Sequence, residues 1–325
     1  MTGSSQRLGA YLSPRDRLAT GVDLAHRAET LGYDSVWLTH GQGRDGFLVL
    51  AAYAHRTERI GLGTGVVPIY PRHPVAMAQE ASTLMELSGG RFRLGIGLSH
   101  RPAMVGALGL DMGEPLAVMR EYMAVLRSAL HGEVAFEGRY YQVRWMGAFR
   151  TAPPPVLLAG LAPPMLELAG ELADGVVLWL ASPAYVRDVA VPALARGRAR
   201  AGKPLEGFEI VAAVPLAVTD DHASATRLFR EELVRYLSLP YYRTMFRGSG
   251  FGEVVTAFDR ARGPGRDADA VPASIIDALG AIGDARRVRA EVDAYRAAGV
   301  TLPVVRPIGP PESAHARSTL EAVVS

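Results

Sequence analysis

The sequence predicts an α/β protein built as a (β/α)8 TIM barrel with insertions, and three observations lead to this fold class. Eight short apolar segments recur along the 325 residues, and each is followed by a segment that reads as a helix. The apolar segments are continuous runs, as expected for parallel strands that are buried on both faces. Hydrophobic residues make up 49% of the chain and charged residues 21%, so a large core is available.

The expected strands and helices alternate along the chain, which favours a closed barrel. The strands are the apolar runs at residues 8–12, 35–39, 60–67, 92–98, 156–159, 175–180, 210–218 and 301–306. Several of the helices open with proline or with a capping Asp, Ser or Thr. The helices fit at residues 14–30, 47–54, 74–87, 115–130, 165–171, 184–201, 222–236 and 285–297.

Two stretches of the sequence are additional to the eight strand–helix units of a minimal barrel. Residues 133–150 read as a small hairpin, and residues 240–283 form a long insertion with glycine and aspartate before the last helix. Long excursions of this kind are usually lids or partner surfaces. We therefore expect one barrel domain over residues 1–325, with insertions at about 133–150 and 240–283.

Charge and composition exclude several function classes. The net charge is only +2 and the arginines are spread along the chain, so no nucleic-acid partner is expected. Cysteine is absent, which removes disulfides, a thiolate nucleophile and zinc–thiolate sites. The first seven residues lack the apolar stretch of a signal peptide, and no apolar run approaches the roughly 18 residues that span a bilayer. We expect a cytoplasmic protein without a membrane partner.

A glycine-rich stretch, GQGRDG at residues 41–46, fits the G-x-G-x-x-G fingerprint of dinucleotide-binding loops. In a Rossmann unit, an acidic residue about 20 positions further on binds the ribose at the end of the next strand. The next expected strand here runs into Pro68, Ile69 and Tyr70 without an acid. We therefore interpret residues 41–46 as a loop after the second strand that helps to shape a pocket, with Arg44 and Asp45 as a local pair or polar contacts.

Other catalytic motifs are absent from the sequence. It contains no Walker loop, no H-E-x-x-H, no G-x-S-x-G elbow and no spacing of metal ligands. Neither hydrolysis nor a metal site is expected.

Residues 58–102 carry a family resemblance, through the blocks GLGTGVVPIYPRHP, LSGGRFRLG and IGLSHRP. The stretch strongly resembles the bacterial-luciferase-like superfamily, and within it the branch that uses the deazaflavin coenzyme F420. The resemblance continues through residues 32–37, 156–175 and 293–300, so it covers nearly the whole chain.

The resemblance implies an oxidoreductase that transfers a hydride between coenzyme F420 and a small organic substrate. An FMN-dependent monooxygenase that uses oxygen is the alternative within the same fold, and a non-catalytic flavin-binding protein is a third. Family membership also implies a homodimer. The sequence does not identify the substrate.

The family binds its ring at the C-terminal mouth of the barrel, where the strand ends converge. Many members carry a non-prolyl cis peptide at the end of the third strand. By position this bond is Gly65–Val66, and Thr64, Gly65, Val66 and Val67 are the expected cofactor contacts there.

At the end of the second strand, similar enzymes have an acid followed by a histidine that faces the substrate side of the ring. This sequence has Thr39 and His40, so the histidine is kept and the acid is absent. Thr39 is expected to contact the cofactor, and His40 is the expected catalytic residue. An imidazole with a pKa of about 6.5 can give or take a proton while a hydride moves. A purely structural histidine is the alternative.

The ends of the next two strands are expected to hold part of the cofactor and its phosphate. Small residues let the chain approach a ligand closely, and the polar side chains and backbone amides offer donors to an anion. The expected residues are Gly97, Leu98, Ser99, His100, Ala159, Gly160 and Leu161. Aromatic residues for an apolar substrate pocket are weaker expectations, namely Tyr11, Trp37 and Trp179. We expect His73 to start the third helix and Glu80 to be a satisfied buried carboxylate.

Overall fold

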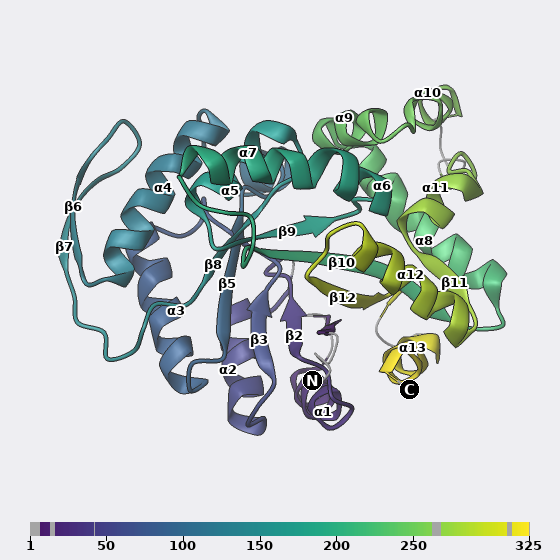
Figure 1. Ribbon diagram of the computed structural model, residues 1–325, viewed down its shortest axis with the longest axis horizontal. Helices are drawn as coiled ribbons and strands as arrows, with labels where there is room; N and C mark the ends of the chain where they lie inside the picture. The colour runs from purple at the N-terminus through teal and green to yellow at the C-terminus, as the bar shows by residue number, and fades with distance from the viewer. Residues whose placement is uncertain (1–6, 14–16, 42, 262–267, 311–313, 325) are drawn as a thin grey trace.

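The computed structural model describes residues 7–13, 17–41, 43–261, 268–310 and 314–324, and in it the eight expected strands close into a parallel barrel (Figure 1). The ring closes through the pairing of β9 with β10 and of β12 with β1. This confirms the predicted fold class. The barrel strands are β1 (Gly9–Tyr11), β2 (Ser35–Leu38), β3 (Gly61–Thr64), β5 (Phe92–Gly97), β8 (Val156–Ala159), β9 (Gly175–Trp179), β10 (Glu209–Val218) and β12 (Leu302–Pro307).

Helices surround the barrel at the expected places. The bounds predicted for α3, α4 and α12 agree with the structure, the helix expected at 184–201 is divided into three, and residues 14–16 of the first expected helix lie outside the described residues. These helices are α1 (Leu18–Thr30), α2 (Gly46–Arg56), α3 (Pro74–Leu87), α4 (Pro115–Leu130), α5 (Pro163–Leu172), α6 (Pro183–Tyr185), the π-helix η2 (Val186–Ala190), α7 (Val191–Arg200), α8 (His222–Leu237) and α12 (Ala285–Ala297).

Aspartates at three N-caps explain why α2, α8 and α12 begin where they do. The side chains of Asp45, Asp221 and Asp284 each accept a hydrogen bond from an amide three residues further on, at 3.1, 3.0 and 2.7 Å. Such a cap satisfies a donor that the first turn leaves without an intrahelical partner.

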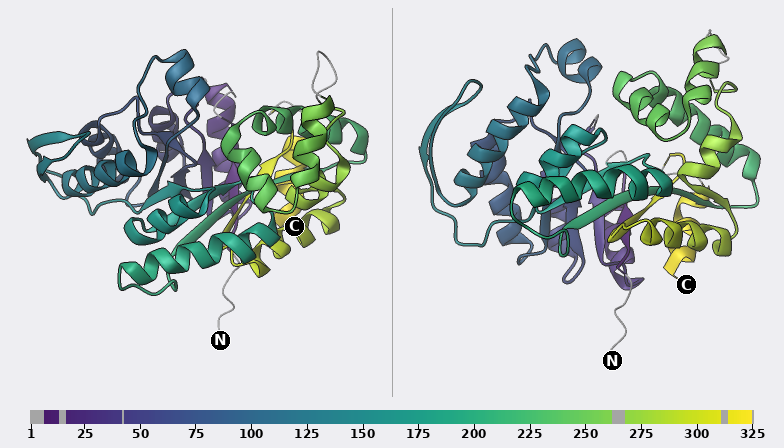
Figure 2. Two further views of the ribbon diagram at one scale, coloured as in Figure 1. Left: turned by 90° about the horizontal axis from the view of Figure 1, so that it is seen from above. Right: turned by 45° about the horizontal axis from the view of Figure 1, so that its top comes forward.

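The two predicted insertions have different structures. The hairpin of β6 (Glu133–Glu137) and β7 (Gln142–Met146) is confirmed, and it stands away from the barrel beside α4 (Figures 1 and 2). The second insertion is helical, and its helices gather at one corner of the molecule together with α8 (Figure 1). It contains α9 (Pro240–Gly248), α10 (Gly252–Ala261), α11 (Ala273–Leu279) and β11 (Ala281–Gly283), while residues 262–267 lie outside the described residues.

The strand expected at residues 60–67 is divided into β3 and β4 (Val67–Pro68). Two further elements had no counterpart among the sequence-based expectations, the π-helix η1 (Pro102–Ala107) and the C-terminal helix α13 (Ala314–Val324). The hydroxyl of Tyr33 donates to the carbonyl of Leu320 at 2.7 Å, which ties α13 to the start of the barrel. Within the described part of the chain, no helix is both long and apolar enough to cross a membrane.

The N-terminal end of the barrel is held by two charged side chains. The guanidinium of Arg91 donates to the carbonyls of Ala54, Thr57 and Ile60 at 2.7 to 3.2 Å. The carboxylate of Glu29 accepts from the amides of residues 58–60 at 2.5 to 3.0 Å. In a barrel of this type the N-terminal end contributes stability rather than catalysis. Arg91 of the LSGGR block is therefore a structural residue.

The pairing of β3 with β5 is interrupted at Thr64. Its hydroxyl donates to the carbonyl of Gly95 and accepts from the amide of Gly95, both at 2.8 Å. Gly65–Val66 follows directly and is cis, as expected, and the chain then rejoins β5 through β4. A Cβ atom on Gly95 would lie 2.0 Å from the carbonyl oxygen of Thr64, so only glycine fits there.

This close approach predicts a large effect of a single methyl group. We expect Gly95→Ala to lower the free energy of unfolding by about 3 kcal/mol, the upper end of what overpacking costs, because the atom it meets is backbone. The measurement is denaturant unfolding followed by circular dichroism. Gly106→Ala is the control, since a Cβ atom at Gly106 meets nothing within 4 Å. Equal stabilities of the two variants would contradict this account of Thr64 and Gly95.

Candidate active site

Two unusual backbone conformations mark the C-terminal mouth of the barrel. Among the described residues, Ser99 and Leu180 are the non-glycine residues with positive φ, at 60° and 55°. Ser99 follows β5 and Leu180 follows β9. Residues held in such conformations cost about 1–3 kcal/mol and gather at functional sites. The structure therefore points to the same end of the barrel as the fold rule for catalytic sites.

The segment Gly65–Val66 is clamped to the end of β2. The hydroxyl of Thr39 donates to the carbonyl of Gly65 at 2.8 Å, and the amide of His40 donates to the carbonyl of Val66 at 3.2 Å. On the other side, a Cβ atom at Gly97 would lie 2.8 Å from Cγ2 of Val66. The expected cofactor residues of the second, third and fourth strands are thus brought together at the mouth.

His40 lies in a polar network at the loop after β2. Its Nδ1 accepts a hydrogen bond from the amide of Gly46 at 2.9 Å, and its Nε2 lies 3.3 Å from Nη1 of Arg72. An acid is present after all, because Oδ2 of Asp45 is 3.7 Å from Nδ1. Burial lowers the pKa of His40 below its ordinary value, the charge of Arg72 lowers it further, and Asp45 raises it in part. The ring is neutral at pH 7.

Arg72 is a site residue that the sequence analysis did not identify. Its Nη2 donates to Asp45, its Nε donates to Glu80 at 2.9 Å, and its guanidinium lies 5.7 Å from the ring centre of Phe47. Glu80 is satisfied, as expected, although its side chain is 37% exposed rather than buried. The expectation for His73 is also confirmed, since its Nδ1 accepts from an amide at the start of α3.

The opposite side of the mouth is aromatic. His100 makes edge contacts with Tyr236 of α8 and Tyr242 of α9, with ring centres 6.4 and 5.7 Å apart. Trp179 lies 5.8 Å from Tyr236. Burial lowers the pKa of His100 and raises the pKa of Tyr236 to about 12, so both rings are neutral at pH 7. The helical insertion thus reaches the end of β5 through Tyr242.

A charge-compensated arginine lies beside this aromatic group. Both terminal nitrogens of Arg306, on β12, donate to the carboxylate of Glu232 at 2.6 Å. The guanidinium lies 5.1 Å from the ring centre of Trp179 and 5.9 Å from that of Tyr11. Arg306 ends the expected strand at residues 301–306, and this position was the available signal in the sequence. Sequence spacing does not pair it with a residue 74 positions away.

Trp37 has a different role from the one expected. It is 2% exposed inside the barrel, where it packs with Leu157, Val177, Val211, Leu302 and Val304. Its Nε1 donates to the hydroxyl of Ser35 at 2.9 Å. Trp37 is therefore core beneath the mouth, and the expectation that it lines a substrate pocket is wrong. Tyr11 and Trp179 lie at the mouth, in contact with Arg306.

The end of β8 is partly engaged within the protein. The amide of Gly160 donates to the carbonyl of Val177 at 3.4 Å, and the carbonyl of Leu161 accepts from the hydroxyl of Tyr185 at 2.5 Å. Binding of a phosphate by Ala159, Gly160 and Leu161 stays a prediction.

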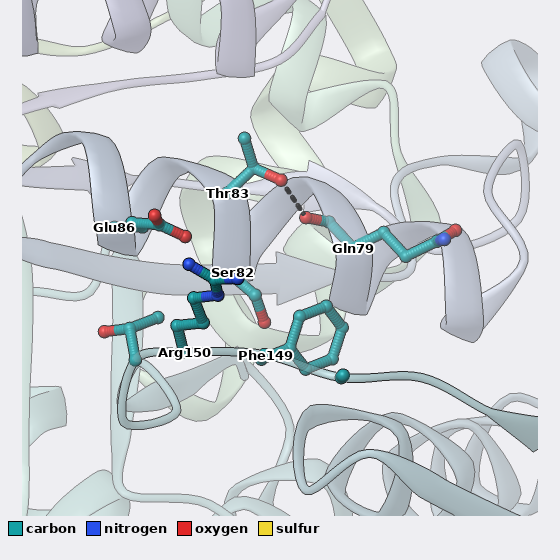
Figure 3. Close-up of a pocket in the computed structure, with 8 residues that line it drawn as sticks. Gln79, Ser82, Thr83, Glu86, Phe149 and Arg150 are labelled. Atoms are coloured by element: carbon teal, nitrogen blue, oxygen red, sulfur yellow. Dashed lines mark hydrogen bonds between the residues drawn. The ribbon is translucent and has the colours of Figure 1, made fainter.

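Two surface hollows lie away from the strand ends. The larger, of about 340 Å³, is between the outer face of α3 and the loop after β7, where Gln79, Ser82 and Glu86 face Phe149 and Arg150 (Figure 3). In Figure 3 the hydroxyl of Thr83 donates to the Gln79 carbonyl within the helix, at 2.8 Å. The second, of about 270 Å³, lies at the N-terminal end of the barrel beside Arg91. Neither hollow contains the strained strand ends or a candidate catalytic histidine.

Comparisons with known proteins identify a family and a fold. Residues 2–302 match the family model described as luciferase-like monooxygenase. A Mycobacterium tuberculosis protein described as a candidate coenzyme F420-dependent oxidoreductase is 31% identical over 311 residues, which cover 87% of this chain and 89% of that protein. A 5,10-methylenetetrahydromethanopterin reductase of Methanolobus tindarius is 34% identical over 222 residues, 67% of each chain.

A solved structure supports the same relationship. The coenzyme F420-dependent tetrahydromethanopterin reductase of Methanopyrus kandleri superposes with a TM-score of 0.84 and is 26% identical. The superposition covers 98% of this chain and 97% of the reductase.

The Arg306–Glu232 pair generates a prediction about stability. Both side chains are about 15% exposed, at 16% and 14%. Removing one partner of a buried pair leaves an uncompensated charge, so we expect Glu232→Gln to lower the free energy of unfolding by about 3 kcal/mol. The matched control is Glu231→Gln, whose partner Arg227 is 64% exposed and whose loss should cost less than about 1 kcal/mol. Similar losses in denaturant unfolding of the two variants would contradict this assignment.

Proposed function

We propose, because the chain belongs to the luciferase-like monooxygenase family, that it is an oxidoreductase transferring a hydride between coenzyme F420 and a small organic substrate. The observation that carries the choice of F420 is the 31% identity, over most of both chains, to a candidate F420-dependent oxidoreductase. The 26% identical F420-dependent reductase structure supports the same choice.

Contacts around Gly65 and Val66 support the binding of a planar ring at the mouth. The hydroxyl of Thr39 holds the carbonyl of Gly65, and the amide of His40 holds that of Val66, whose side chain forms a ridge against Gly97. Gly65 has no Cβ atom to obstruct a flat ligand. We infer that Thr39, Thr64, Gly65, Val66 and Val67 hold the ring. The turn at the end of β5 and the end of β8 would carry the rest of the cofactor, through Gly97, Leu98, Ser99, His100, Ala159, Gly160 and Leu161. The deazaflavin, when bound, supplies or accepts the hydride at a ring carbon.

His40 is the proposed catalytic residue. It follows the end of β2, and its own amide bonds the carbonyl of Val66, so its backbone is fixed against the ridge. The side chain is 19% exposed and so is partly accessible to solvent. His100 is a less suitable reacting group, because Tyr236 and Tyr242 pack against its ring.

An FMN-dependent monooxygenase is the second candidate function, because the matching family model is named for monooxygenases. A flavin has nitrogen where the deazaflavin has carbon, and only the flavin forms the usual peroxide adduct with oxygen. The identity of the cofactor therefore distinguishes the two functions.

The choice of cofactor is tested by affinity. We expect F420 to bind at least tenfold more tightly than FMN, a difference of about 1.4 kcal/mol. Anaerobic fluorescence titration of the purified protein with each compound gives the two dissociation constants. Equal affinities, or tighter binding of FMN, would favour the monooxygenase.

The role of His40 is tested by truncation. We expect His40→Ala to lower the rate of single-turnover hydride transfer by about 10²–10⁴-fold, the effect of losing general acid–base assistance. The affinity for F420 should be unchanged, because the ring is held by other residues. The substrate for this assay would first be identified by screening small carbonyl compounds and alcohols for turnover with F420.

The control is His131→Ala, at the exposed C-terminal end of α4, which should keep the full rate. A nearly full rate in His40→Ala would rule out the assignment. The same loss in His100→Ala instead would place the reacting group at β5.

A further inference from the structure

We propose that Trp179, Tyr236 and Tyr242 form a substrate subsite at the mouth, and that this subsite takes an uncharged, flat aromatic group that carries a hydrogen-bond acceptor. This inference rests on the proposed function, because it names the class of substrate that would meet the cofactor. It also gives the helical insertion a role, since Tyr242 belongs to α9 and completes the subsite.

A continuous wall of aromatic rings follows one side of the mouth. The ring centre of Trp179 lies 5.8 Å from that of Tyr236, which lies 4.7 Å from that of Tyr242. His100 ends the wall at β5, with its ring centre 5.7 Å from that of Tyr242. Trp179 and Tyr236 are partly exposed, so a ligand can reach the wall. Aromatic pairs attract by more than the burial of their area, so this wall favours an aromatic ligand over an aliphatic one of the same size.

Unusual backbone conformations adjoin two members of the wall. Leu180, with a φ of 55°, directly follows Trp179, and Ser99, with a φ of 60°, directly precedes His100. Such conformations are unfavourable for residues that have a Cβ atom, and they gather at ligand-binding and catalytic sites. The ends of β5 and β9 therefore present His100 and Trp179 from strained turns, as expected for side chains that serve a ligand.

Two polar groups of the wall lack hydrogen-bond partners within the described part of the chain. Nε1 of Trp179 is buried without a partner. Burial raises the pKa of Tyr236 and the nearby indole N–H lowers it in part, but these two groups do not have the geometry of a hydrogen bond. Tyr242 is 5% exposed, and its hydroxyl forms no hydrogen bond with the described residues. Polar groups at such depth normally have partners, and an acceptor atom on a ligand would satisfy them.

The surroundings of the wall disfavour a charged ligand. Burial lowers the pKa of His100 and raises the pKa of Tyr242 well above its ordinary value, so both side chains are neutral at pH 7. Arg306, whose guanidinium lies 5.1 Å from the ring centre of Trp179, is neutralised by Glu232. Desolvation that keeps the protein's own side chains uncharged also opposes a charge on the ligand.

Binding at the subsite is observable without cofactor, through the indole N–H of Trp179. The chain has three tryptophans, so this signal in ¹H–¹⁵N spectra of the ¹⁵N-labelled protein is identified by its loss in Trp179→Phe. The probe is acetophenone, an uncharged aromatic ketone. We expect acetophenone to shift the Trp179 signal in a saturable way and to leave the signal of Trp145, on the β6–β7 hairpin, unchanged.

Two analogues of acetophenone test the chemical class in the same titration. Cyclohexyl methyl ketone keeps the carbonyl but has a saturated ring, so it should bind at least about threefold more weakly. The 4-acetylbenzoate anion keeps the aromatic ketone and adds a carboxylate, so it should bind at least about tenfold more weakly.

Tyr242→Phe tests the hydroxyl from the insertion. This substitution keeps the ring and removes one hydrogen-bonding group, so acetophenone should bind about threefold to tenfold more weakly than to the wild type. Tyr241→Phe is the matched control, because this neighbour on α9 is 52% exposed and the variant should bind as the wild type does.

The absence of a saturable shift of the Trp179 signal would overturn the proposal. So would an affinity for either analogue equal to that for acetophenone, or an unchanged affinity in Tyr242→Phe. The wild-type titrations decide the question where a variant does not fold. They contain no cofactor, so failure here is distinct from failure of the proposed function, which the F420 titration decides.

Discussion

The mouth of the barrel depends on the contact between Thr64 and Gly95. At this point β3 leaves the backbone ladder, and one threonine hydroxyl replaces it by bonding both the amide and the carbonyl of Gly95. The absence of a Cβ atom at Gly95 lets the two chains come this close. The next residues, Gly65 and Val66, face the end of β2. The hydroxyl of Thr39 donates a hydrogen bond to the carbonyl of Gly65, and the amide of His40 donates one to the carbonyl of Val66. The segment Gly65–Val66 and the backbone of His40 are therefore parts of one hydrogen-bonded unit.

On each side of the mouth an arginine is paired with carboxylates. Arg72 is neutralised by Asp45 and Glu80, and Arg306 by Glu232, so each arginine is held in one orientation by carboxylates. Such partly buried pairs add little net stability, because desolvation offsets their attraction, but they fix geometry. Between them, burial keeps His40 and His100 uncharged at neutral pH. The site thus offers neutral hydrogen bonds and aromatic surface, with the charges of Arg72 and Arg306 already paired.

The sequence predicted the parts of this protein that local pattern encodes. The barrel strands are continuous apolar runs, so their places were found, and the cis bond at Gly65–Val66 followed from a family motif. The helices α9 to α11 were not predicted, because residues 240–283 were expected only as a long insertion with glycine and aspartate, although buried apolar residues recur there at helical spacing. The inward position of Trp37 depends on which side of β2 faces the barrel axis. A continuous apolar run does not reveal that side.

The chemistry of the site depends on contacts that sequence spacing does not encode. Arg72 lies 32 residues from His40 and 27 from Asp45 along the chain, and it reaches both because the fold brings the loops after β2 and β4 together. The role of the stretch GQGRDG, at residues 41–46, also depends on such contacts. In a dinucleotide-binding unit the amides at the helix start face a pyrophosphate. Here the helix also starts at a glycine, but the amide of Gly46 donates to an imidazole nitrogen and the carboxylate of Asp45 binds an arginine. A carboxylate at the helix start disfavours a phosphate and compensates a cation, so the residue that distinguishes the two uses of the motif is Asp45.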